Sequence, residues 1–168
     1  MQRILVVDDA EVNRELLLEM LQGDYAVELA EDGEGAVRKL QEYQYEIAAL
    51  LLDLQMPRMG GFAVIREMER CGWLNRIPVL VISGEQAAEV ENQCFEMGVS
   101  DFIHKPFEMS IVKNRIKNAV ELFTYKNQLE QRVERQTERL LLIDSKGLRL
   151  YFSENSALRI RSLVSTSM

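Results

Sequence analysis

The 168 residues are enough for one ordinary domain and a short appendage, and a hydrophobic content of 47% supports a buried core. The net charge of −7 is uneven, because residues 1–106 carry 20 acidic and 9 basic side chains whereas residues 107–168 carry 7 and 11. An acidic body repels phosphate backbones, which argues against nucleic acid as a partner. The sequence has no apolar run of about 18 residues to cross a membrane. Its two cysteines lack the pattern of a disulfide framework, so we expect a cytoplasmic protein.

Short apolar runs alternate with amphipathic segments along the first two thirds of the chain. We expect strands at residues 3–7, 25–29, 47–52, 79–82 and 100–104. We expect helices at residues 11–22, 34–43, 62–70, 86–97 and after Pro106. Alternating strands and helices with short connections indicate right-handed βαβ units. The sequence therefore predicts an α/β fold, a doubly wound parallel sheet of five strands with helices on both faces.

Reactive side chains stand at the carboxyl ends of four predicted strands. Asp8 and Asp9 follow the first strand, and Asp53 follows the third. Ser83 follows the fourth strand, and Lys105 follows the fifth. Parallel strands present their carboxyl ends at one edge of a sheet, so we expect these side chains to lie close together. Three neighbouring carboxylates repel one another unless a cation lies among them, and oxygen ligands suit Mg²⁺.

Each of these residues, taken singly, has a structural explanation. Asp8 and Asp9 could cap a helix, and Asp53 could belong to a turn. Lys105 could be a solvated loop residue, and Phe102 could be an ordinary core residue. Only the joint pattern favours a site that binds a phosphoryl group next to a metal ion.

The segment from Phe107 to Ile143 contains neither Gly nor Pro and is longer than one closing helix requires. Residues spaced alternately by 3 and 4 form a heptad seam, namely Ala119, Leu122, Lys126, Leu129, Val133, Gln136, Leu140 and Ile143. Lys126 and Gln136 interrupt the seam, and an amphipathic helix packed on its own domain is the alternative. We favour a coiled coil that forms a homodimer. The predicted parts are a domain at 1–120, a coiled-coil extension at 121–143 and an irregular, Ser-rich tail at 144–168.

Five motifs in this order resemble the receiver family of two-component signalling. They are Asp8-Asp9, AlaGluAspGlyGluGlyAla at 30–36, AspLeuGlnMetPro at 53–57, Ser83-Gly84, and PheIleHisLysPro at 102–106. The resemblance covers residues 1 to about 120 and implies a flavodoxin-like sheet with strand order 2-1-3-4-5. It implies a response regulator and not an enzyme, apart from self-phosphorylation and autodephosphorylation. The chain departs from the family at Gly60-Gly61, where Asp-Gly is common, so the loop after Asp53 is expected to be more mobile.

The resemblance also implies a role for each matching residue. Asp53 would accept a phosphoryl group from a sensor histidine kinase. Asp8, Asp9, Asp53 and the backbone carbonyl of Gln55 would hold Mg²⁺. Lys105 would help the metal to neutralise the phosphoryl oxygens.

Two further residues would transmit the signal. The hydroxyl of Ser83 would close onto the phosphoryl group, and Phe102 would turn inward in response. The Lys105–Pro106 peptide bond is expected to be cis. The face formed by the fourth helix, fifth strand and fifth helix would then change shape, together with the C-terminal helix.

The output of this switch is open. The C-terminal helix resembles connectors in regulators with cyclic-di-GMP output modules such as HD-GYP phosphodiesterases, but residues 1–168 contain none of their catalytic motifs. One alternative is therefore a truncated receiver with a missing output domain, and another is a protein-interaction scaffold that phosphate no longer switches. A DNA-binding regulator is disfavoured by the acidic body. An aspartyl phosphatase is disfavoured because Asp8-Asp9-Ala10 is not a DxD motif.

Overall fold

The computed structural model describes residues 2–43, 45–84 and 87–144, with side chains placed as far as residue 136. Its contacts divide the chain into two units, Met1–Asn127 and Gln128–Met168. The strands are β1 (Arg3–Val7), β2 (Ala26–Ala30), β3 (Ile47–Leu52), β4 (Val79–Ser83) and β5 (Asp101–His104). The helices are α1 (Glu11–Leu21), α2 (Gly33–Tyr43), α3 (Gly61–Arg70), the 3₁₀ turn η1 (Trp73–Asn75), α4 (Ala88–Glu96) and α5 (Met109–Asp144).

All five strands are parallel and lie in the order β2-β1-β3-β4-β5, which confirms the predicted doubly wound sheet. The register aligns the strand ends that matter for function. Val7 stands opposite Ala30 and Leu52, the last residues of β2 and β3. Ser83 stands opposite His104 at the ends of β4 and β5. Residues that follow β1, β3 and β5 therefore emerge at the same edge.

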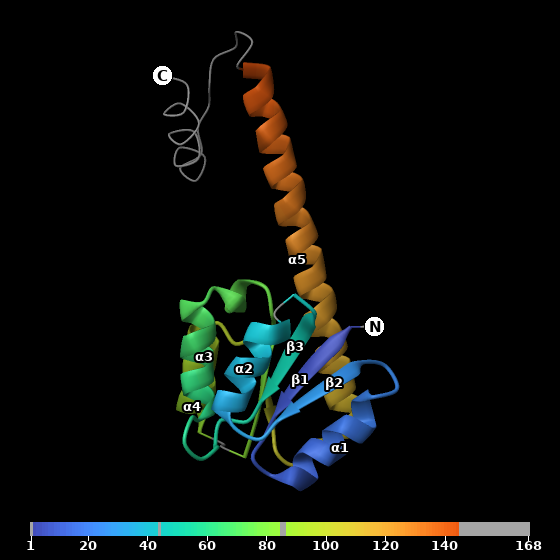
Figure 1. Cartoon of the computed structure of the whole chain (residues 1–168), viewed down its shortest axis with the longest axis vertical. Coiled ribbons are helices and arrows are strands. Elements are labelled where there is room, and N and C mark those ends of the chain that lie inside the picture. The colour runs from blue at the N-terminus through green and yellow to red at the C-terminus, as the bar shows by residue number, and fades with distance from the viewer. Residues whose placement is uncertain (1, 44, 85–86, 145–168) are drawn as a thin grey trace. The chain divides into compact units, whose positions relative to one another are not determined.

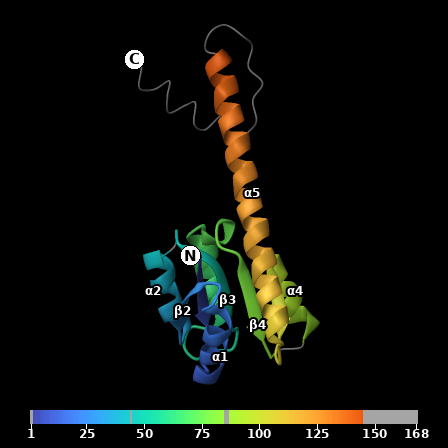
Figure 2. The same ribbon diagram turned by 90° about the vertical axis from the view of Figure 1, so that its right-hand side faces the viewer.

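The central strands are buried on both faces, and their side chains alternate between two hydrophobic clusters. In β3, Leu50 and Leu52 belong to the cluster that packs against α2, α3 and α4, whereas Ala49 and Leu51 belong to the one that packs against α1 and α5. Figure 1 shows the sheet between these two layers of helices. Figure 2, turned by 90°, has α1 and the first part of α5 in front of the strands. This arrangement explains why the strand sequences are nearly continuous apolar runs.

Helix α5 is continuous from Met109 to Asp144, as the uninterrupted segment predicts. Its first turns bury Val112 and Ile116 against the sheet. Leu129 and Val133, in the second unit, are 40% and 61% exposed. The division into parts at residues 120 and 143 stays a prediction, and the predicted tail lies outside the described residues except for Asp144.

Within the described ranges, no helix combines the length and the apolar character that a membrane crossing requires.

Candidate functional site

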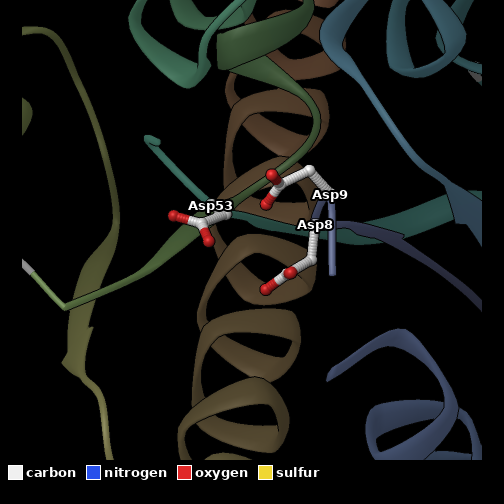
Figure 3. A group of neighbouring side chains, drawn as sticks. All are labelled: Asp8, Asp9 and Asp53. Carbon is white, nitrogen blue, oxygen red and sulfur yellow. The ribbon is translucent and has the colours of Figure 1, made fainter. Parts of the chain in front are cut away.

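Three carboxylates converge at the carboxyl edge of the sheet. Asp8 and Asp9 follow β1, and Asp53 follows β3, so both strands deliver acids to one place. One oxygen from each of the three carboxylates lies within 4.8 Å of the others, and Figure 3 shows the three side chains close together. Asp8 and Asp53 are buried, with 2% and 6% of their surface exposed, whereas Asp9 is open to solvent. The predicted clustering of these acids is therefore observed.

Lys105 neutralises part of this negative charge. Its Nζ donates to Oδ2 of Asp53 at 2.5 Å and to Oδ2 of Asp8 at 2.8 Å. The lysine is placed by the connection between β5 and α5, where the Lys105–Pro106 peptide bond is cis as expected. Burial alone would lower the pKa of Lys105, but the two carboxylates together raise it. The amine therefore stays charged and bridges the ends of β1 and β3.

The phosphoacceptor candidate Asp53 has an unusual environment for a carboxylate. Burial raises its pKa, and the negative charge of Asp8 adds to this effect. Lys105 and the backbone N–H of Gln55, which donates to Oδ1 at 3.0 Å, oppose the shift. A carboxylate that is crowded by another acid and removed from water is stabilised by any cation that enters the cluster.

Two residues that sequence reasoning missed hold the loop between β1 and α1. Asn13 donates through Nδ2 to both carboxylate oxygens of Asp8, at 3.0 and 3.1 Å. Arg14 donates to the carbonyl oxygens of Asp8 and Asp9, at 2.8 and 2.9 Å. The backbone N–H of Ala10 also donates to Asp8, at 2.9 Å. The available signal was a pair of polar residues in the first turn of the helix that follows the acids.

The loop from Asp53 to α3 is packed too tightly to carry a side chain at Gly61. A Cβ on Gly61 would lie 2.5 Å from the carbonyl oxygen of Asp53 and 2.8 Å from Cα of Leu54. The N–H of Gly61 donates to the carbonyl of Leu54 at 3.1 Å. Gln55, whose carbonyl is the fourth predicted metal ligand, lies in this loop and is exposed. Its role as a ligand stays a prediction.

The two predicted switch residues lie on the neighbouring strands. Ser83 is fully buried at the end of β4, and its carbonyl accepts a hydrogen bond from the N–H of Lys105 at 2.8 Å. Phe102 is 4% exposed, so its ring already lies inward in this structure. It contacts the ring of His104, with centroids 5.0 Å apart. The imidazole of His104 lies 3.3 Å from the Glu91 carboxylate, on a side chain that is 48% exposed.

The donor set fits a hard divalent cation. Asp8, Asp9 and Asp53 offer only carboxylate oxygens, the ligands that suit Mg²⁺ rather than softer metals. A cation there would also relieve the repulsion between the acids. With Lys105 beside it, the cluster has the charges to bind the oxygens of a phosphoryl group next to the carboxylate of Asp53.

Comparison with known proteins identifies the family. Residues 4–117 match the model of the response regulator receiver domain. The chain is 34% identical over 113 residues to a probable cyclic di-GMP phosphodiesterase of Vibrio cholerae, covering 67% of this chain and 25% of that protein. It is 39% identical over 116 residues to the transcriptional regulatory protein ResD of Bacillus subtilis, covering 68% and 46%.

Solved structures agree with this match. The chemotaxis protein CheY4 of Vibrio cholerae superposes with a TM-score of 0.66 at 26% identity, covering 71% of this chain and 98% of that one. The chain spans between 7% and 57% of the length of these curated relatives, which differ in the activities that their names describe. The chain therefore belongs to the response regulator receiver domain family, the phosphoryl-accepting domains of two-component signalling.

Proposed function

We propose that Asp53 is the residue that accepts the phosphoryl group, and that its donor is a sensor histidine kinase. The observation that carries this proposal is the position of Lys105 Nζ, which contacts Asp53 and Asp8 within a cluster that also includes Asp9. In the transfer, the N–P bond to the donor histidine breaks and an O–P bond to an Asp53 carboxylate oxygen forms. Attack by water on the resulting acyl phosphate returns inorganic phosphate and the free carboxylate.

Mg²⁺ would be held by Asp8, Asp9, Asp53 and the carbonyl of Gln55. Bound there, the ion would offset the charge of the phosphoryl oxygens during transfer. Asp8 is oriented for this by the amide of Asn13, which contacts both of its oxygens. Burial raises the pKa of Asp53, so a positive charge placed beside its carboxylate favours the ionised form that would act as the nucleophile.

The chain's own residues would also transmit the signal. The Lys105 amine would bind one phosphoryl oxygen, and the Ser83 hydroxyl would donate to another. Lys105 and Ser83 lie at the ends of adjoining strands. A movement of either residue toward the phosphoryl group would therefore affect β5 and the helices beside it. The ion pair between Asp101 at the start of β5 and Arg115 on α5 offers a direct path to the C-terminal helix.

We further propose that α5 pairs with a second copy of the chain. Leu122, Leu129 and Val133 share the heptad seam and are 66%, 40% and 61% exposed, which is unusual for apolar side chains so closely spaced. Phosphorylation would alter the pairing or register of this coiled coil. A missing output domain that follows such a helix would receive the signal in the cytoplasm.

Intact-mass spectrometry with a small phosphodonor tests the acceptor assignment. We expect the wild-type chain, incubated with acetyl phosphate and Mg²⁺, to gain the mass of one phosphoryl group. Asp53→Asn should gain none, and Asp24→Asn, which changes an exposed acid on the surface, should behave as wild type. Modification of Asp53→Asn at the wild-type rate would overturn the assignment and favour the scaffold alternative.

Light scattering tests the coupling to α5. The purified chain is measured with Mg²⁺, with and without beryllofluoride, which mimics a phosphoryl group on aspartate. A change of mass or shape in wild type but not in Asp53→Asn supports the proposed switch. A monomer under both conditions rules out the coiled coil, and a dimer whose mass and shape ignore beryllofluoride rules out control of pairing by phosphorylation.

A further inference from the structure

The start of α2 contacts the loop that carries Gln55. The N–H of Gly33 donates to the carbonyl oxygen of Met59 at 3.1 Å. A Cβ on Gly33 would lie 2.4 Å from that same oxygen, so no side chain fits between the two backbones. The contact joins segments that lie more than 25 residues apart in the chain. The loop between β3 and α3 therefore packs against the start of α2.

The residues that immediately precede Gly33 and Met59 form an ion pair, which reinforces this contact. The guanidinium of Arg58 pairs with Oδ2 of Asp32, whose side chain is 5% exposed. The other oxygen of Asp32 accepts the N–H of Gly35 at 2.7 Å. The Gly35 N–H, Arg58 and the nearby Arg38 hold the pKa of Asp32 below its usual range, so the carboxylate is charged near neutral pH. Arg58 thus bonds to an acid that the first turn of α2 already fixes.

The backbone of Arg58 is in a conformation that arginine rarely adopts. Its φ is +63°, and it is the one non-glycine residue with a positive φ in the part of the chain that the structure describes. A left-handed conformation is unfavourable for a side chain with a Cβ, and it persists only where surrounding contacts require it. The pair with Asp32 and the adjacent Met59 contact supply such a requirement.

The restrained loop begins at the proposed phosphoacceptor. The N–H of Gln55 donates to Oδ1 of Asp53 at 3.0 Å, and the N–H of Gly61 closes the loop onto the carbonyl of Leu54. Arg58 holds the middle of the same loop. A loop fixed at its start, middle and end loses less freedom when its backbone is used as a ligand.

We propose that the Asp32–Arg58 ion pair is a positioning device, which holds the loop of residues 54–60 so that the carbonyl of Gln55 is set for Mg²⁺. This inference rests on the proposed metal site, but the restraint itself is a property of the metal-free protein. Neither Asp32 nor Arg58 is among the residues proposed to hold the ion or the phosphoryl group. Their effect passes through the loop backbone, as supporting groups act on metal ligands elsewhere.

Hydrogen exchange in metal-free protein measures the restraint directly. We expect the Gly33 amide, which bonds to Met59, to exchange at least threefold faster in Arg58→Ala than in wild type. Arg58→Gly also removes the ion pair, but it relieves the unfavourable φ. If the Gly33 amide exchanges faster in this variant too, the restraint comes from the ion pair. Arg70→Ala is the matched control, because it removes an exposed ion pair with Glu67 on α3.

Titration calorimetry with Mg²⁺ then measures the consequence for the ligand. Arg58→Ala and Asp32→Asn should each raise the dissociation constant of Mg²⁺ by about three- to tenfold, which is up to 1.4 kcal/mol. The double variant should lose no more than either single variant. Arg58→Lys, which retains the charge, should recover most of the affinity.

The two readouts separate the two ideas. If the wild-type chain binds no Mg²⁺, the proposed function fails, and the Gly33 exchange rate still decides whether the pair restrains the loop. If wild type binds Mg²⁺ but Arg58→Ala changes neither the exchange rate nor the dissociation constant, the positioning role is overturned. Thermal unfolding of each variant checks that an observed change does not come from loss of the fold.

Discussion

The Nζ of Lys105 lies 2.5 Å from Oδ2 of Asp53, and 2.8 Å from Oδ2 of Asp8. The lysine is thus the resident counter-ion of two carboxylates that are also proposed to bind a metal. A lysine and a divalent cation that share ligands oppose each other's binding, because each repels the other and each withdraws charge from the same oxygens. The same amine is also proposed to bind the phosphoryl group, so we expect Lys105 to have opposite effects on metal binding and on phosphoryl transfer.

Lys105→Ala separates those effects. We expect the variant to bind Mg²⁺ about three- to tenfold more tightly in titration calorimetry, because a competing positive charge has been removed. Phosphorylation by acetyl phosphate at saturating Mg²⁺ should be slower by at least about tenfold, since a charge that stabilises the transferring group is lost. Lys113→Ala, which loses a surface pair with Asp24, should change neither value. Weaker Mg²⁺ binding in Lys105→Ala would contradict the competition.

The effect of Asp53→Asn on the free energy of unfolding should change sign when Mg²⁺ is added. Burial raises the pKa of Asp53 above its unfolded value, so the ionised carboxylate opposes folding near neutral pH, and this cost is absent below the unfolded pKa. Without metal, the variant should be more stable by about 1 kcal/mol. With Mg²⁺ at 100 times its dissociation constant, wild type should gain about 2.7 kcal/mol, and the variant much less. Urea unfolding followed by the fluorescence of Trp73, the only tryptophan, measures both differences.

Much of the fold and the acid cluster could be predicted because both depend on local pattern. Runs such as IleAlaAlaLeuLeuLeu at 47–52 are apolar throughout, which indicates a strand buried on both faces, and such strands end at one edge. The same pattern predicts that Asp8, Asp53 and Lys105 lie close together. Boundaries were less accurate where the pattern is weak. Strand β2 spans Ala26–Ala30 rather than 25–29, and α4 ends at Glu96 rather than at 97, while the predicted start at 86 lies outside the described residues.

The supporting contacts could not be predicted, because they depend on how elements sit against one another. Asn13 reaches Asp8 from the first turn of α1, across the connection that follows β1. The Arg58–Asp32 pair joins two loops that are 26 residues apart in the sequence. Neither loop's sequence indicates that the two side chains meet. Apolar periodicity determines which face of an element is buried, but it carries no information about polar side chains at loop ends.

Gly61→Ala should be strongly destabilising. The added Cβ would lie 2.5 Å from the Asp53 carbonyl oxygen, a backbone atom that cannot move away without disturbing the site. We expect a loss of about 2–4 kcal/mol in the free energy of unfolding. Gly23→Ala is the matched control, since no atom lies within 4 Å of its Cβ, and a change within about 0.5 kcal/mol is expected. Equal stability of the two variants in urea would show that the loop can shift freely.

The contribution of Glu28 to stability should disappear in acid. Hydrogen bonding to Lys39, at 2.6 Å, and the charges of Lys39 and Arg3 hold the pKa of Glu28 below its ordinary value of 4.5. A lowered folded-state pKa means that the contribution is complete above about pH 4.5 and is lost as the pH falls through the folded value. Glu28→Gln should therefore cost about 1 kcal/mol at pH 7 and less at about pH 3, where the advantage of the carboxylate is being lost.

Urea unfolding at the two pH values makes this comparison. Glu46→Gln is the control, because Glu46 also pairs with Arg3 but is 62% exposed, and exposed pairs contribute little. A cost of Glu28→Gln that is the same at both pH values would mean that packing, rather than charge, accounts for it.

A charge placed in the α5 seam should abolish the proposed dimer. Leu129 lies at the centre of the heptad pattern, and Leu129→Glu would set two carboxylates against each other in a paired seam. We expect the variant to be a monomer in light scattering at concentrations where wild type is a dimer. Gln131→Glu adds the same charge two residues away and off the seam, so it should leave the dimer intact.

Because both residues are exposed in the single chain, neither change should alter the free energy of unfolding of that chain by more than about 0.5 kcal/mol. A shift of Leu129→Glu to monomer would then report loss of pairing rather than loss of the helix, and equal masses for the two variants would exclude this seam as the interface.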